Sequence, residues 1–165
     1  MMRALFFLLI FAVLISCSQS RSIIPRPQPL SSLQINTTQN VGACSFYVSI
    51  RTSCSSTRYT RDRISLSFGD AYGNQVYAPR LDDPRSRTFE RCSTDTFQIN
   101  GPCTYQICYL YLYRSGYDGW MPYDVTVSGY NTQPVSFYYN VFIPGDIWYG
   151  FNNCYRATSA SLAMK

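Results

Sequence analysis

The sequence predicts a single all-β domain held together by disulfide bonds, and three observations carry that prediction. Apolar and polar residues alternate along most of residues 41–157, and turns rich in Gly and Asp separate the alternating stretches. No stretch carries a helical period. Six cysteines follow an apolar leader, an even number that indicates disulfide bonds in an exported protein. Short strands divided by such turns are typical of two packed antiparallel sheets.

The chain begins with the pattern of a signal peptide over residues 1–18. Arg3 precedes an unbroken apolar stretch from Ala4 to Ile15, and small and polar residues follow. This stretch is shorter than the about 20 apolar residues that cross a bilayer, and we expect no transmembrane segment. We therefore expect a secreted protein, in the extracellular space or the endomembrane lumen. A bacterial lipidation box ending at Cys17 is the competing interpretation, less favoured because nothing else in the chain is typical of bacteria.

The next segment, residues 19–40, is rich in Ser, Gln, Thr and Pro, with prolines at 25, 27 and 29. Such a composition buries too little apolar surface to offset the entropy of ordering, so we expect a flexible segment or a trimmed pro-segment. A glycosylation sequon begins at Asn36 and fits export. Residues 41–157 then have the size of one β-sandwich domain, and residues 158–165 form a loose tail.

The cysteines left after the leader favour three disulfides over a metal site. The sequence has no His and no Cys-x-x-Cys, so a zinc site is a poor fit. Six cysteines allow 15 pairings. The one pair we expect is Cys44 with Cys154, if the first and last strands are antiparallel neighbours. The six are Cys44, Cys54, Cys92, Cys103, Cys108 and Cys154.

Period-two stretches within the domain predict the strands in order. In the first two, apolar residues at 46, 48, 50 and at 64, 66, 68 alternate with polar ones or Tyr, which places one face on the core and the other in water. The expected strands cover about residues 46–50, 63–68, 74–78, 87–90, 96–100, 105–114, 123–128, 134–143 and 147–151.

The stretch from Tyr105 to Arg114 has large side chains on both faces, which indicates a central strand. Its alternate tyrosines, Tyr109, Tyr111 and Tyr113, are interpreted as packing residues with their hydroxyls at the rim, in preference to a sugar-binding aromatic ladder.

The charge balance is mildly basic and argues against nucleic acid as a partner. Thirteen of the fourteen basic residues are Arg, and loss of Arg3 with the leader changes the formal charge from +5 to +4. Nucleic-acid binding needs a stronger basic patch, and export also disfavours it. Anionic lipid, sulfated glycan or an acidic protein remain as possible partners.

The residue types available argue against catalysis. Without His there is no Ser-His-Asp or Cys-His arrangement, so acid-base work would fall to carboxylates. Apart from Glu90, these are eight Asp residues, most of them at turns, and Asp82 and Asp83 are adjacent rather than facing across a cleft. No phosphate-binding or dinucleotide motif is present.

Loop residues with oxygen donors could hold calcium. Asp70, Asn74, Asp95 and Asp118 all lie on predicted loops, and Ca²⁺ accepts six to eight such oxygens. The simpler interpretation is that these residues form turns.

The two tryptophans allow different interpretations. Trp120 follows a Gly-rich turn and could insert into a membrane interface, but capping the core is favoured because Trp buries so much area. Trp148 lies in an apolar strand and is expected in the core.

Several ordered segments together form a family pattern: TSC at 52–54, TRDRISL at 60–66, FGDAYGN at 68–74, CSTDTF at 92–97, GPC at 101–103 and WYGF at 148–151. Over about residues 43–154 they closely resemble the plant embryo-specific protein family, which looks like a branch of the PLAT (lipoxygenase-homology) domains. The run from Tyr109 to Arg114, the Gly turn with Trp120 and the strand at 125–127 are similar to a PLAT domain. The resemblance implies an eight-stranded antiparallel sandwich of two four-stranded sheets.

The resemblance also implies a role. PLAT domains are lipid- or protein-docking modules, in some cases assisted by calcium, and we expect no catalytic domain to accompany this one. We therefore expect a secreted, non-catalytic module that binds membrane lipid or another protein during seed or embryo development. Its loop tips around Asp70, Asn74, Asp118 and Trp120 are expected at one end of the sandwich. We expect no required cofactor, with calcium as the one candidate.

Two other functions are compatible with the sequence. One is a structural or storage-associated protein of the seed wall or vacuole, with no defined ligand and with tyrosines available for oxidative coupling. The other is a small hydrolase or lectin that acts on wall polysaccharide. The observation that suggests it is the Tyr-rich strands.

Overall fold

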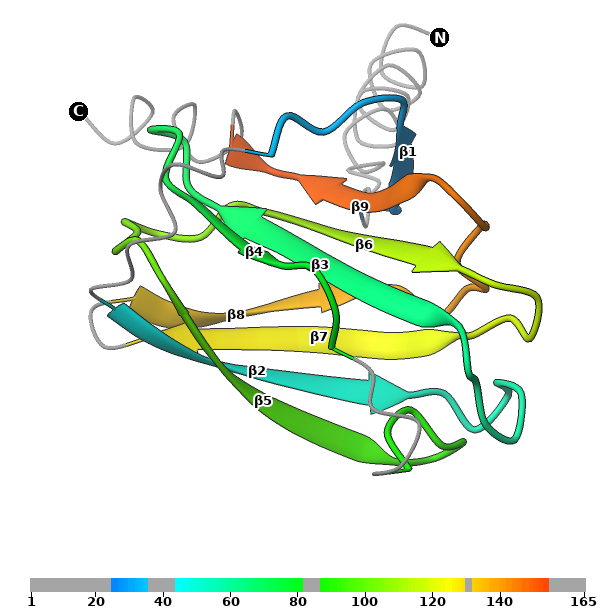
Figure 1. Cartoon of the computed structure of the whole chain (residues 1–165). Helices are drawn as coiled ribbons and strands as arrows, with labels where there is room; N and C mark the ends of the chain where they lie inside the picture. Colours follow the sequence, from blue (N-terminus) through cyan, green and yellow to red (C-terminus); the bar gives the residue numbers. More distant parts are fainter. Residues whose placement is uncertain (1–24, 36–43, 82–86, 130–131, 155–165) are drawn as a thin grey trace, which may run out of the picture.

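The computed structural model describes residues 25–35, 44–81, 87–129 and 132–154, and within them the chain forms nine strands in two stacked antiparallel sheets (Figure 1). The five-stranded sheet has the order β1 (Gln28–Leu30), β9 (Trp148–Asn152), β6 (Tyr109–Ser115), β3 (Arg63–Gly69) and β4 (Gln75–Ala78). The four-stranded sheet has the order β5 (Thr94–Gly101), β2 (Cys44–Thr52), β7 (Pro122–Gly129) and β8 (Thr132–Tyr138). The predicted all-β, disulfide-bonded sandwich is confirmed.

The core lies between the two sheets and is built from the apolar face of each strand. Val48 and Ile50 of β2 face Leu66 of β3 and Leu110 of β6, all without solvent exposure. Each such side chain stabilises the fold by about 1.5–3 kcal/mol relative to its exposed state. An edge-to-face contact of the Phe46 and Phe68 rings, 5.2 Å between centroids, joins the layers.

β1 is an addition to the eight strands that the family resemblance implies, and it was not among the strands expected from the residue pattern. β1 lies in the segment expected to be flexible, and its three residues pair with β9 at the edge of the five-stranded sheet. Pro29 lacks an N–H, which an edge strand tolerates because one side of its backbone has no partner strand. With only three residues, β1 is too short to show the alternation of apolar and polar side chains from which a strand can be predicted.

Three other predicted strands have different bounds. Residues 87–90 form a turn instead of a strand, because Arg87 and Phe89 adopt positive φ angles of 59° and 63°. β6 starts at Tyr109, where its pairing with Gly69 of β3 begins, rather than at residue 105. β8 ends at Tyr138, shortly before Asn140, whose φ of +46° interrupts extended backbone.

Trp148 does not lie in the core, where it was expected. It is half-buried on the outer face of the five-stranded sheet, where its ring lies 5.3 Å from that of Tyr113 and 6.2 Å from that of Tyr77. The register explains the position, because Trp148 pairs directly with Tyr113, and Tyr113 is on the face opposite Leu110 and Leu112.

The disulfides join Cys44 to Cys103, Cys54 to Cys92 and Cys108 to Cys154. The expected Cys44–Cys154 pair is therefore wrong. Cys44 begins β2 in the four-stranded sheet, between β5 and β7, whereas Cys154 follows β9 in the other sheet. Each bridge is expected to stabilise the fold by roughly 2–4 kcal/mol.

Candidate functional site

The loops expected to form one site lie at opposite ends of the sandwich. Asp70 and Asn74 follow β3, whereas Asp118 and Trp120 follow β6, the antiparallel neighbour of β3. The seven residues of β3 separate the two groups by about 20 Å. Asp95, near the start of β5, shares the end of Asp118. We call these the Asp70 end, at the left of Figure 1, and the Trp120 end, at the right.

At the Asp70 end, a buried carboxylate organises two loops. Asp70 Oδ1 accepts hydrogen bonds from the backbone N–H groups of Tyr72 (2.8 Å) and Asn74 (3.1 Å). Its Oδ2 accepts from Asn74 Nδ2 (2.7 Å) and from the backbone N–H of Tyr105 (2.8 Å), in a loop 35 residues away. Four donors occupy the lone pairs of this carboxylate.

At the Trp120 end, arginines satisfy the acidic side chains. Asp118 Oδ2 accepts from the backbone N–H (2.9 Å) and Nε (3.0 Å) of Arg61, and Oδ1 accepts from Nη2 (3.1 Å). These hydrogen bonds lower the pKa of Asp118. The buried Asp62 accepts from Arg114 Nη1 and from the backbone N–H groups of Asp118 and Gly119, both at 3.0 Å.

These contacts leave the predicted calcium ligands without a common site. Asp95 Oδ2 likewise accepts from the backbone N–H of Phe89 (2.9 Å) and from Ser93 Oγ (3.1 Å). Within the described residues, no three acidic, His or Cys side chains gather closely enough to hold a metal ion. The four predicted donors fit the turn interpretation better than the six to eight ligands of Ca²⁺.

Trp120 occupies the core and is not an exposed anchor. Its side chain has no solvent exposure, its ring lies 4.8 Å from that of Phe89, and its Nε1 donates to Thr52 Oγ1 at 3.0 Å. The favoured core position of Trp120 is therefore the one found.

Three aromatic side chains at the Trp120 end are exposed instead, and sequence reasoning missed them as site residues. Tyr117 is fully exposed, and Tyr59 and Phe142 are each about half exposed. Arg58, which precedes Tyr59 in the chain, is also exposed, and so is Arg91, whose backbone N–H donates to Arg58 O (3.0 Å). We call these five residues the aromatic tip. One feature of the sequence could have indicated this surface. Tyr117 lies inside the Gly116–Gly119 turn, and an aromatic ring in such a turn is expected to remain outside the core.

Contacts between three loops fix the aromatic tip. Thr57 Oγ1 donates to Gly119 O at 3.0 Å, and Ile143 N donates to Trp120 O at 3.0 Å. The Phe142 ring lies against Gly119. The backbone carbonyls of Gly119 and of the buried Trp120 therefore hold the three loops in one arrangement.

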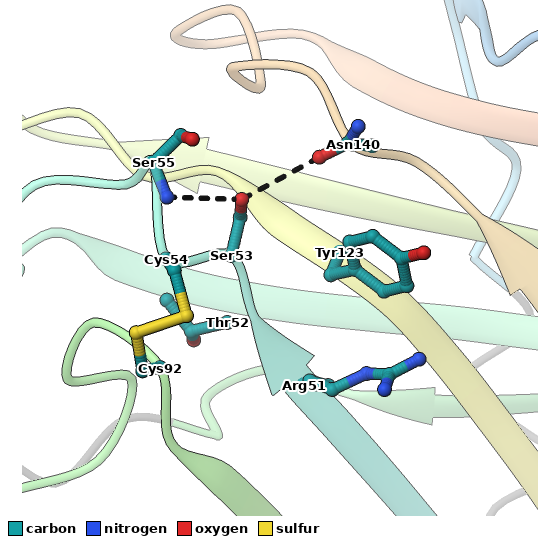
Figure 2. A pocket seen from close by; sticks show the side chains of 8 residues that line it. All are labelled: Arg51, Thr52, Ser53, Cys54, Ser55, Cys92, Tyr123 and Asn140. Atoms are coloured by element: carbon teal, nitrogen blue, oxygen red, sulfur yellow. Dashed lines mark hydrogen bonds between the residues drawn. A yellow bond between two sulfur atoms is a disulfide. The ribbon is translucent and has the colours of Figure 1, made fainter.

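A pocket of about 340 Å³ opens beside this end, lined by Arg51, Ser53, Tyr123, Asn140 and the Cys54–Cys92 disulfide (Figure 2). The Arg51 guanidinium lies 4.3 Å from the centre of the Tyr123 ring and is hydrogen-bonded to Asp124, which raises the pKa of Arg51.

The polar groups of this pocket are bonded to one another rather than arranged for catalysis. Ser53 Oγ accepts from Ser55 N (3.2 Å) and donates to Asn140 Oδ1 (3.4 Å), as the dashed lines in Figure 2 show. Neither partner is a base that could activate a serine nucleophile. The arrangement offers hydrogen bonds and one fixed guanidinium, which suit binding.

Comparison of sequences relates the chain to embryo proteins of plants. Residues 31–154 match the family described as Embryo-specific protein 3. Embryo-specific protein ATS3B of Arabidopsis thaliana is 53% identical over 162 residues, which cover 97% of this chain and 85% of the relative. ATS3A of the same plant is 55% identical over 139 residues, covering 83% and 78%. These relatives are named as embryo-specific proteins and not as enzymes.

Comparison of structures relates the fold to the PLAT domains of lipoxygenases. Coral 8R-lipoxygenase aligns with a TM-score of 0.53 and 18% identity, over 64% of this chain and 17% of that one. The chain thus spans about a sixth of the lipoxygenase, in its PLAT domain and outside the catalytic part. At this identity the likeness shows the fold alone. Among the described residues, no helix is long and apolar enough to cross a membrane.

Proposed function

The chain belongs to the Embryo-specific protein 3 family, and from that premise we propose that it is a secreted, non-catalytic module that docks on membranes containing anionic lipid during seed or embryo development. The observation that carries the proposal is the aromatic tip, where the fully exposed Tyr117 and the half-exposed Phe142 share one end of the sandwich with two exposed arginines. Secretion is supported by the three disulfides, which suit an oxidising compartment.

The chemistry of the tip suits a lipid interface. A Tyr ring places its apolar body among acyl chains and its hydroxyl among headgroups. Arg58 and Arg91 make no ion pair with another described residue, so their charge is available to anionic headgroups. Each such arginine contributes about 1 kcal/mol near an anionic membrane surface, a contribution that salt weakens.

Docking is expected to proceed without added calcium. The coral lipoxygenase is activated by calcium through its C2-like domain. In the present chain, Arg61 and Arg114 bind the carboxylates of Asp118 and Asp62, so these two carboxylates already have cationic partners within the chain.

The experiment is co-sedimentation of the mature chain with vesicles of phosphatidylcholine alone or mixed with phosphatidylserine, with calcium or with a chelator. We expect sedimentation with the mixed vesicles in both conditions, reduced at high salt. Tyr117→Ser should weaken it severalfold without loss of stability, because the ring is fully exposed. The matched control is Tyr72→Ser, an exposed tyrosine at the opposite end, which should bind as the unmodified chain does.

Absence of sedimentation with every vesicle, or equal loss in both variants, would contradict the proposal. A pull-down that retains one protein stoichiometrically, and loses it with Tyr117→Ser, would instead assign the tip to a protein partner. The remaining alternative is a structural or storage-associated protein of the seed wall or vacuole. It predicts high abundance with neither lipid nor protein bound.

A further inference from the structure

Two exposed tyrosines at the Asp70 end lie in ring contact with each other. Tyr72 is 78% exposed and Tyr105 is 66% exposed, yet their ring centroids are 4.9 Å apart with the ring planes tilted by 58°. They come from the turn between β3 and β4 and from the loop before β6. Burial does not explain the pairing, because both rings remain mostly in water.

The backbone holds the two tyrosines together. Both of their N–H groups donate to the carboxylate of Asp70, one to each oxygen, at 2.8 Å. The loop of Tyr105 is tied down further by the Cys44–Cys103 disulfide two residues away and by the hydrogen bond from Cys108 N to Gly69 O at 2.9 Å. The pair is therefore positioned before any reaction.

We propose that Tyr72 and Tyr105 are a site of oxidative cross-linking, in which a peroxidase that uses hydrogen peroxide joins the two rings. The peroxidase removes one hydrogen atom from each phenol. The two phenoxyl radicals form a carbon–carbon bond between the ring positions next to the hydroxyls, and loss of a proton from each of these carbons to its oxygen restores both phenols. One H₂O₂ is reduced to two H₂O, and the protein loses two hydrogen atoms in total.

Geometry favours this pair over the other tyrosines. Coupling of two rings already in contact is intramolecular, and such proximity gives a high effective concentration. Tyr59 and Tyr117 are exposed but have no ring contact with another described aromatic residue, so they would have to react between molecules. Tyr109 and Tyr111 are 6.2 Å apart, but Tyr111 is buried and therefore poorly accessible to an enzyme.

The product would be a covalent link that thiols cannot break. It would join the turn after β3 to the loop before β6, close to the Cys44–Cys103 disulfide. The two loops at the Asp70 end would then remain covalently joined under reducing conditions that open the disulfide. This inference does not depend on the proposed membrane docking.

The test exposes the mature chain, at low concentration, to a plant-type peroxidase and limiting H₂O₂. We expect dityrosine fluorescence, a monomer on a denaturing gel, an intact mass lower by two hydrogen atoms, and a cross-linked peptide pair containing Tyr72 and Tyr105. Tyr72→Phe and Tyr105→Phe keep a ring in place but remove its phenol, so each should lower the monomer fluorescence about tenfold. The matched control Tyr59→Phe should leave it unchanged.

A second variant, Asp70→Asn, tests the positioning because it keeps both phenols while weakening the hydrogen bonds that align them. It should lower the yield of the intramolecular product, with folding checked by circular dichroism. The proposal is overturned if Tyr72→Phe retains the monomer fluorescence, or if the main product is a dimer joined through other tyrosines.

Discussion

The guanidinium of Arg114, in β6, is hydrogen-bonded to the buried carboxylate of Asp62, the residue that immediately precedes β3. Asp62 also accepts hydrogen bonds from the backbone N–H groups of Asp118 and Gly119. The carboxylate that pairs with Arg114 therefore also fixes the turn that contains the exposed Tyr117. The aromatic tip thus depends on a contact beneath it rather than on packing of its own side chains.

Removal of this carboxylate is expected to be costly. Asp62→Ala leaves Arg114, whose side chain is only 12% exposed, without its counter-ion, and breaking a buried pair in this way costs about 3–5 kcal/mol. Chemical denaturation of the variant should report that loss. The comparison is Arg61→Ala, which breaks the more exposed pair with Asp118 and should cost much less stability than Asp62→Ala, because solvent screens that pair. Equal losses would mean that Asp62 has no special role.

The turn also requires glycine at position 116. A Cβ there would lie 2.1 Å from Asp62 Oδ1, and the φ of +145° is one that other residues avoid. Gly116→Ala should therefore destabilise the fold and displace Asp62, lowering the thermal unfolding midpoint by more than Gly73→Ala. The latter substitution also meets a positive φ, +89°, but no atom within 4 Å, so backbone strain of about 1–2 kcal/mol is its only cost. A milder effect at Gly116 would show that Asp62 can move freely.

The strands could be predicted from the sequence because their signal is local. The alternation of Phe46, Val48 and Ile50 with polar or Tyr neighbours is set by the pleat of one strand and needs no knowledge of its partners. The same is true of the fully buried Leu110 and Leu112, which identified a central strand. Such patterns fixed the fold class together with the family resemblance.

The arrangement of the loops could not be predicted, because it depends on which strands are neighbours. Asp70 and Asp118 lie at opposite ends because β3 and β6 are antiparallel partners, a pairing between residues far apart in sequence. The Cys44–Cys154 prediction was wrong for the same reason, since the strands that hold them belong to different sheets. The exposure of Tyr117 likewise follows from a tertiary contact, the bond between Asp62 and the turn.

Stability at alkaline pH is expected to depend on Tyr109. Burial raises the pKa of its hydroxyl to about 12, whereas an unfolded tyrosine titrates near 10. The unfolded chain therefore loses this proton first, so the contribution to stability is complete below pH 10 and is lost as the pH rises through about 12. Tyr109→Phe should flatten the fall of the unfolding free energy over this range. The control Tyr47→Phe, at a side chain more than half exposed, should follow the unmodified chain.

The three disulfides are expected to differ in their resistance to reduction. Cys54 and Cys92 are both exposed at the pocket beside Arg51, whereas Cys108 and Cys154 are buried. Because a thiolate must reach a sulfur atom to open a disulfide, limited treatment with a thiol reductant should open Cys54–Cys92 before Cys108–Cys154. Alkylation followed by peptide mass spectrometry at short times would identify the first pair. Initial labelling of Cys108 or Cys154 would mean that local opening of the β9 end, rather than static exposure, controls access.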